Sequence, residues 1–168
     1  MREAYYHEDD FCMIELLPLD NLQHCLTQMG EQQVFADAHR SGAGWTEMYV
    51  PEAPPSQMRA LGMTAEQLRL ALADAMPPYD AVYTGYSSYR VECKNVLAFG
   101  GEKTETLFAG LGDDGIVVDL WCSDAMPQLL LLLPLKEQLL LADWGAGFAC
   151  PLADGDLFAR YLQEYELD

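Results

Sequence analysis

The segment Tyr89-Arg-Val-Glu-Cys-Lys-Asn-Val-Leu-Ala-Phe99 carries the clearest structural signal in this chain of 168 residues. Apolar or aromatic residues occupy positions 89, 91, 93, 97 and 99, and Arg90, Glu92 and Lys94 stand between them. A period of two is typical of a β-strand with one buried face and one solvated face. We therefore predict one continuous strand over residues 89–99.

Two further β-forming segments follow this strand. Thr104–Gly110 and Ile116–Cys122 are joined through Gly112-Asp-Asp-Gly115, and glycine and aspartate readily adopt the positive φ angles of tight hairpins. Residues 110–115 also match GxGxxG, but that motif binds a pyrophosphate only where a helix begins, and a β-forming segment follows here. The three segments together predict an antiparallel meander.

The flanking segments contain both strand and helix signals. We expect strands at Phe11–Leu17 and Trp45–Val50, and a last strand at Gln138–Trp144. We expect helices from a cap at Asp20 to about Arg40, from a capping box at Thr64–Gln67 to about Met76, and from a cap at Asp154 onward. Periodicity leaves Ala125–Leu133 open between helix and strand. We predict one α+β domain over residues 1–168, an antiparallel sheet with helices packed mainly on one face.

Acidity is the outlying property of the composition. Nine Lys and Arg residues against 27 Asp and Glu residues give a net charge of −18. The halves before and after Thr84 carry 13 and 14 acidic residues against 4 and 5 basic ones, so each is −9. A negative field repels nucleic acids and anionic lipids and attracts basic proteins. We expect a basic partner and neither nucleic acid nor membrane, unless the charge only keeps the protein soluble.

Cysteine usage and the N-terminal sequence predict a cytoplasmic protein. The five cysteines are odd in number and form no CxxC pair, which is typical of free thiols in a reducing compartment. The opening MREAYYHEDD has no apolar signal core. The most apolar segment, Leu129–Leu135, is far shorter than the ~20 residues that a membrane-spanning helix needs.

No catalytic motif stands out in the sequence. His7-Glu-Asp-Asp10 groups four potential metal ligands, but the sequence marks no others to complete a site. An activated thiol in a Cys–His pair needs electropositive surroundings, which nine basic residues supply poorly. We expect no enzyme activity, catalytic residue, metal or cofactor, and keep a small enzyme using carboxylates or a Cys–His pair as an alternative.

Four tyrosines lie close together in the sequence, at positions 79, 83, 86 and 89. Tyrosine joins a large apolar ring to a polar tip and is enriched at protein interfaces, although such a cluster can also pack the edge of a core. With the acidic residues in turns, the cluster gives a set of candidate partner-binding residues. They are Asp9, Asp10, Tyr83, Tyr86, Asp113 and Asp114.

Three stretches of the chain together resemble a known class of proteins. They are residues 6–18, residues 83–90, and residues 139–144 with 156–162. This layout resembles the small acidic immunity proteins that bacteria encode beside polymorphic or contact-dependent toxins. The resemblance implies a cytoplasmic protein that binds and blocks one cognate toxin and is not an enzyme. An oligomer-forming structural protein is the remaining alternative.

Overall fold

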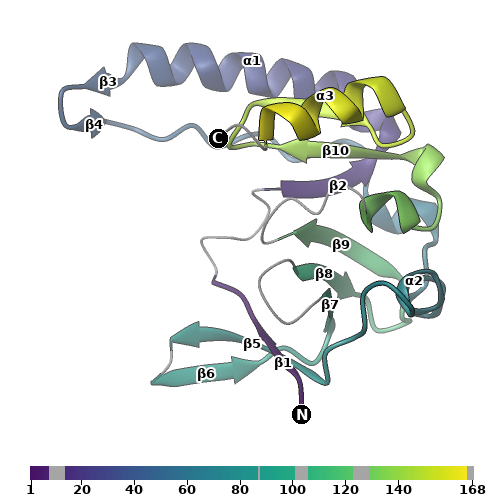
Figure 1. The fold of residues 1–168 in the computed structure, drawn as a ribbon. Coiled ribbons are helices and arrows are strands. Elements are labelled where there is room, and N and C mark those ends of the chain that lie inside the picture. Colours follow the sequence, from purple (N-terminus) through teal and green to yellow (C-terminus); the bar gives the residue numbers. More distant parts are fainter. Residues whose placement is uncertain (8–13, 87, 101–105, 123–128, 166–168) are drawn as a thin grey trace.

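A computed structural model of the chain describes residues 1–7, 14–86, 88–100, 106–122 and 129–165. Within these residues the main element is a six-stranded sheet in which neighbouring strands are antiparallel. Its order is β11 (Phe148–Pro151), β10 (Leu139–Asp143), β2 (Ile14–Pro18), β9 (Val117–Cys122), β8 (Thr106–Leu111) and β7 (Val96–Gly100) (Figure 1). The predicted α+β class with a mainly antiparallel sheet is confirmed, and β7, β8 and β9 form the predicted meander.

The predicted single strand over residues 89–99 is wrong. The chain turns after Glu92, so Tyr89–Glu92 forms β6 in a second sheet and Val96 begins β7 in the large one. At the turn, the Cys93 amide donates to the Val82 carbonyl at 2.8 Å, so residue 93 is still bonded to β5 and not to the large sheet. The period of two continues across the turn, which is why the pattern gave no sign of it.

The second sheet has three strands and covers part of one face of the large sheet. Its order is β1 (Glu3–Tyr5), β5 (Ala81–Tyr86) and β6, with β1 parallel to β5. Between the sheets, Phe108 stacks on Trp121 with ring centroids 5.4 Å apart, and Tyr6 meets both rings edge-on. Val82 and Ala4 close this cluster from the small sheet.

The helices pack on both faces of the large sheet. Helix α1 (Leu22–Ala38) lies on the face that the small sheet also covers, with Cys25 and Met29 against Leu17 and Leu140. The opposite face carries the largest core cluster. It is covered by α2 (Ala65–Leu72), α3 (Gly155–Tyr165) and the 3-10 helices η3 (Met58–Leu61) and η4 (Leu129–Leu132). No helix in the described ranges is long and apolar enough to cross a membrane.

Two of the predicted helix starts are confirmed. Thr64 and Gln67 form the capping box of α2, with hydrogen bonds of 3.0 and 3.1 Å. The Asp154 carboxylate accepts the Leu157 amide at 3.1 Å and begins α3. Asp20 does not cap α1, because it lies in the 3-10 helix η2 (Leu19–Asn21) that precedes α1.

Three other boundaries differ from the prediction. The strand expected at Trp45–Val50 is reduced to β4 (Gly44–Trp45), which pairs only with β3 (Arg40–Ser41). The following residues run along α1, where the Tyr49 hydroxyl donates to Gln28 at 2.8 Å. The strand β10 is not the last, because Gly147, at φ 65°, lets β11 return beside it. Helix α2 ends at Leu72 and not near Met76.

Candidate binding surface

The hairpin of β5 and β6 presents the most exposed aromatic side chains of the predicted site. Tyr86 pairs with Tyr89, and Thr84 pairs with Val91, so these residues share one face of the hairpin. The same face begins in the core at Val82, which is 3% exposed, whereas Tyr86 and Tyr89 are 78% and 76% exposed. The face of the hairpin that is buried at Val82 is therefore exposed to solvent at the tip. Figure 1 shows the hairpin extending past the large sheet.

The other face of the hairpin is braced by an arginine. The Arg90 guanidinium lies 4.1 Å from the centroid of the Tyr83 ring and donates to the Glu3 carboxylate at 2.9 Å. This hydrogen bond raises the pKa of Arg90 above its usual value. The contact between Arg90 and Glu3 ties β6 to β1 across β5. The hairpin that carries the exposed tyrosines is therefore fixed to the rest of the small sheet. We call Tyr86, Tyr89 and Val91, which share one face, the hairpin surface.

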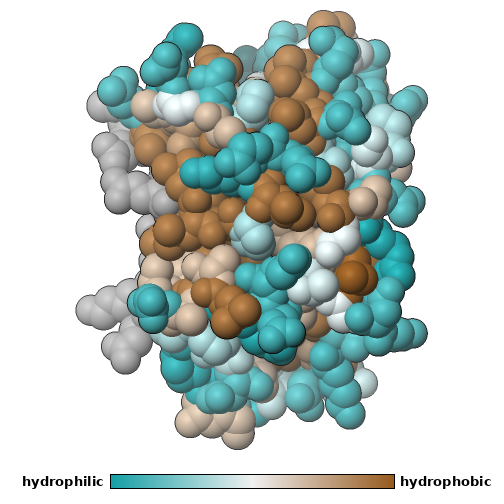
Figure 2. All heavy atoms as spheres, turned by 90° about the vertical axis from the view of Figure 1, so that its right-hand side faces the viewer, coloured by the Kyte–Doolittle hydropathy of each residue, from teal (hydrophilic) through white to brown (hydrophobic). Residues whose placement is uncertain are grey.

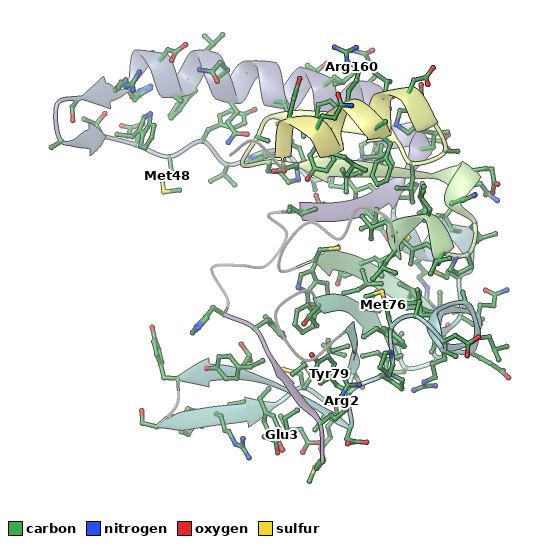
Figure 3. The ribbon with its side chains drawn as sticks, viewed as in Figure 1. Arg2, Glu3, Met48, Met76, Tyr79 and Arg160 are labelled. Atoms are coloured by element: carbon green, nitrogen blue, oxygen red, sulfur yellow. The ribbon has the colours of Figure 1, made fainter. Side chains whose placement is uncertain are left out.

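The predicted tyrosine cluster divides into exposed and packed members. Tyr83 and Tyr86 both lie in β5 but on opposite faces, since they are three residues apart. Tyr79 packs at the edge of the core, and the Arg2 guanidinium lies 4.3 Å above its ring (Figure 3). Tyr89 was outside the nominated set, yet it is as exposed as Tyr86. The sequence signal for the pairing of Tyr86 with Tyr89 is that only two residues separate them.

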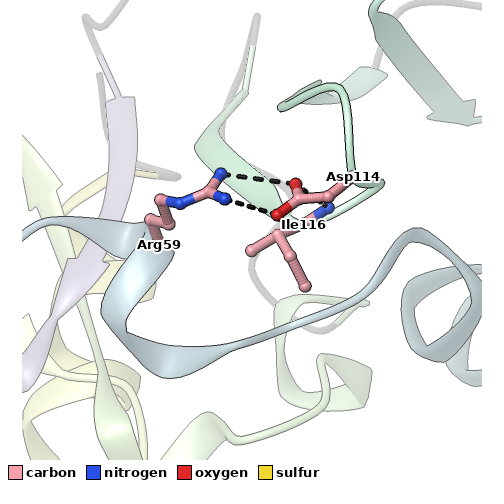
Figure 4. A network of polar contacts seen from close by, with 3 residues as sticks. All are labelled: Arg59, Asp114 and Ile116. Carbon is pink, nitrogen blue, oxygen red and sulfur yellow. Dashed lines mark hydrogen bonds and ion pairs between the residues drawn. The ribbon is translucent and has the colours of Figure 1, made fainter.

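Asp114 serves the fold at the turn between β8 and β9. The Arg59 guanidinium contacts both carboxylate oxygens of Asp114, one of them at 3.3 Å, and the Ile116 amide donates to the same carboxylate (Figure 4). These bonds lower the pKa of Asp114. The turn lies beside the start of α2, where the Ala65 amide donates to the Gly115 carbonyl at 3.0 Å.

The nominated acidic residues are therefore not gathered around the tyrosines. The turn that carries Asp113 and Asp114 and the tip that carries Tyr86 lie on opposite sides of the molecule in Figure 1. Asp9 and Asp10 lie outside the described residues. Of the four nominated residues that the structure describes, Tyr83 and Tyr86 share β5, and Asp113 and Asp114 share the β8–β9 turn.

A second projecting region is formed by residues 30–50, which we call the arm. The part of α1 after Met29 has no buried residue, and β3, β4 and the segment after them lie along it (Figure 1). A shallow groove of about 630 Å³ runs between α1 and Tyr49. Met48, which is 88% exposed, points away from α1 (Figure 3). The arm thus exposes apolar side chains at Val34, Trp45, Met48 and Val50.

A third apolar area lies on the side of the molecule that carries α2 and η4. Figure 2 shows apolar side chains gathered across this side, with hydrophilic residues between and around them. Its exposed members are Leu70, Leu131 and Leu132, at 74%, 40% and 43%. The leucines of η4 continue inward to Leu130, which is buried, so this area is the outer rim of the main core.

The structure shows the surroundings of two cysteines and two histidines. Burial raises the pKa of Cys25 and Cys150 to about 11, so both thiols are protonated at neutral pH. A ring nitrogen of His24 lies 3.1 Å from the Glu52 carbonyl, and one of His39 lies 2.8 Å from the Phe35 carbonyl. In the ranges that the structure describes, no three His, Cys, Asp or Glu residues are grouped as metal ligands.

Comparisons of the chain with protein-family models, with curated proteins and with solved structures found no match. Function therefore has to be inferred from the surface chemistry of the chain itself. Its leading features are two exposed tyrosines at the tip of a braced hairpin and a net charge of −18.

Proposed function

We propose that this chain is a protein-binding domain whose hairpin surface contacts a basic protein, and that this partner is a toxin that the chain neutralises. The observation that carries the proposal is the exposure of Tyr86 and Tyr89, at 78% and 76%, on a hairpin braced by Arg90. Tyrosine is enriched among the residues that dominate binding energy at interfaces. A braced hairpin also loses little conformational freedom on binding, which favours affinity.

The charge of the chain supports a basic partner. A net charge of −18 attracts positively charged proteins over distance and raises the rate of encounter. On the hairpin itself, the single positive group, Arg90, is already paired with Glu3, so it does not oppose a basic partner. Acidic residues would then govern association, while Tyr86 and Tyr89 would slow dissociation. The neutralising role itself rests on the resemblance to immunity proteins.

The hairpin surface is tested with a double variant, Tyr86→Ala/Tyr89→Ala. A basic partner is first captured from host lysate at two salt concentrations, purified, and its affinity for each variant measured by calorimetry. We expect the double variant to bind at least ~30-fold more weakly, because central tyrosines each contribute about 2 kcal/mol at interfaces. Leu70→Ala is the matched control, since Leu70 is 74% exposed on another side of the molecule. Equal affinity of both variants would remove the hairpin from the interface.

Neutralisation is tested separately in cells. The captured protein is expressed alone, with the wild-type chain, and with the double variant. We expect growth arrest in the first case, growth in the second, and arrest again in the third. A partner that binds through the hairpin but is harmless when expressed alone would keep the binding function and reject the toxin.

The arm gives one observation in favour of the alternative, an oligomer-forming protein. Val34, Trp45, Met48 and Val50 are 71%, 63%, 88% and 82% exposed. Such a concentration of exposed apolar side chains is typical of an interaction surface. Sedimentation velocity of the wild type and of Trp45→Asp distinguishes the cases: self-association through the arm predicts a concentration-dependent assembly that the variant abolishes.

A further inference from the structure

Strands β2 and β9 enclose a cleft at the point where they separate. The two strands pair only at Ile14 with Cys122 and at Glu15 with Trp121. Beyond that point η3 lies against both of them. A cleft of about 440 Å³ opens there, lined by Glu15 and Leu17 of β2, by Asp119 of β9, and by residues 53–59.

One wall of this cleft is held in place by a buried amide. Asn21, which is fully buried, donates to the Ser56 carbonyl at 2.7 Å and accepts the Ser56 amide at 2.9 Å. Farther along the same segment, the Glu52 amide donates to the Gln28 side chain at 2.8 Å. Because the segment is bonded to α1 at Glu52 and to η2 at Ser56, this wall of the cleft is held in place without a ligand.

Asp119 is the exposed residue of β9 and lies in the lining of the cleft, so its carboxylate is accessible to a ligand. Asp119 pairs with Gly110 in β8, and its side chain lies over that glycine, where a Cβ would come within 3.2 Å of the carboxylate. No hydrogen-bond donor among the described residues reaches this carboxylate. Partial desolvation raises the pKa of Asp119, and no positive group among the described residues opposes that rise.

The other charged groups of the cleft make it selective for a cation. Glu15 adds a second carboxylate, which accepts the Trp144 indole N–H at 2.8 Å. The Arg59 guanidinium is the cation of the lining, but it is bound to Asp114 at the β8–β9 turn. With that charge paired, two carboxylates face an otherwise largely apolar cleft.

We infer that this cleft binds an arginine side chain of the basic partner. The guanidinium can donate to a carboxylate through two parallel N–H groups, and its aliphatic stem packs on apolar walls. Leu17, Pro54 and Leu120 supply such walls, and Asp119 supplies the acceptor. That the arginine belongs to a basic partner protein rests on the proposed function. That the cleft binds an arginine side chain does not.

Binding in the cleft is tested on the full chain without any partner. Amide NMR spectra are recorded while N-acetyl-arginine amide is added at constant ionic strength, with the neutral analogue N-acetyl-citrulline amide as the matched ligand. We expect saturable shifts at residues 56–59 and 118–120 for the arginine compound only. Asp119→Asn should abolish them, and Asp74→Asn, which removes an exposed carboxylate after α2, should keep them. Shifts spread over the acidic surface, no shift, or shifts that persist in Asp119→Asn would overturn the inference.

The partner then separates the two proposals. If the cleft holds a partner arginine, Asp119→Asn weakens partner binding at least ~10-fold, as loss of a charge-paired group does at interfaces, and Asp74→Asn leaves it unchanged. Partner binding that needs Tyr86 and Tyr89 but not Asp119 would reject the cleft and keep the binding function. Localised shifts with arginine, in a chain that engages no basic protein, would keep the cleft and reject the function.

Discussion

The two hairpins of this chain use their apolar residues in opposite ways. In β8 and β9 most side chains on both faces are buried, with Asp119 as the exposed residue of β9, and the turn is tied to η3 through Arg59 and Asp114. In β6 every residue is exposed, and the tip of its hairpin carries Tyr86 and Tyr89 in solvent. Both hairpins have glycines at positive φ, at Gly85 and Gly115, so turn geometry does not explain the difference.

What differs is the number of layers that cover each hairpin. The β8–β9 hairpin lies in the middle of the fold, with the small sheet on one face and the main core cluster on the other. The β5–β6 hairpin is itself an outer layer, and its buried residue Val82 joins the cluster around Phe108 and Trp121. Stability should therefore depend on the first hairpin, and partner recognition on the second.

The largest expected effect comes from removing Phe108, at the centre of the covered hairpin. Phe108 is fully buried and stacks on Trp121 at a centroid distance of 5.4 Å. We expect Phe108→Ala to lower the free energy of unfolding by about 3–5 kcal/mol, because truncating a buried phenylalanine leaves a cavity that the core fills only in part. Urea unfolding followed by tryptophan fluorescence measures the change.

Tyr86→Ala is the control for this substitution at the exposed hairpin. Tyr86 is 78% exposed, and surface substitutions usually change stability by less than about 0.5 kcal/mol. A loss of stability from Tyr86→Ala as large as that from Phe108→Ala would show that the β5–β6 hairpin supports the fold. The contrast between the two hairpins would then be wrong.

A smaller effect is expected at the turn of the covered hairpin. Gly115 has φ 76°, and a Cβ there would meet no atom within 4 Å. Gly115→Ala should therefore cost only the strain of a left-handed backbone, about 1–2 kcal/mol. Gly30→Ala in α1 is the opposite control, since its Cβ also meets nothing and alanine favours a helix by up to ~1 kcal/mol. Thermal unfolding of both variants should show shifts of opposite sign.

Local signals in the sequence were enough to predict the covered hairpin. Gly112-Asp-Asp-Gly115 between two β-forming segments defines its turn, and the capping box at Thr64 defines the start of α2. Both depend on residues within a few positions of each other. The turn after Glu92 was missed because β6 and β7 keep the same alternation, so the pattern could not reveal that they belong to different sheets.

The site was harder to predict, because its geometry depends on contacts between distant segments. The sequence identified Tyr83 and Tyr86 as candidates, but not the Arg90–Glu3 brace, whose partners are 87 residues apart. It also proposed Asp114 as a binding residue, since nothing local shows that Arg59, 55 residues earlier, pairs with it. The cleft at Asp119 requires β2 and β9 to separate, which is a property of the assembled sheet.

The smallest expected effects are on the pH dependence of stability, where two carboxylates of the covered hairpin should act with opposite sign. The bond from Arg59 lowers the pKa of Asp114, so this residue stabilises the fold above the ordinary carboxyl pKa of about 4, and the contribution disappears as the pH falls through the lowered value. Burial raises the pKa of Asp119, so its ionised form disfavours folding, and stability recovers as the pH falls through the raised value.

Urea unfolding of the wild type, Asp114→Asn and Asp119→Asn between neutral and acidic pH measures both effects. Asp114→Asn should be less stable than the wild type at neutral pH, and the difference should shrink in acid. Asp119→Asn should be as stable as the wild type or more stable at neutral pH, with any gain vanishing in acid. A loss of stability at neutral pH in Asp119→Asn would mean that the carboxylate already has a partner within the fold. The cleft would then have no uncompensated charge to offer an arginine.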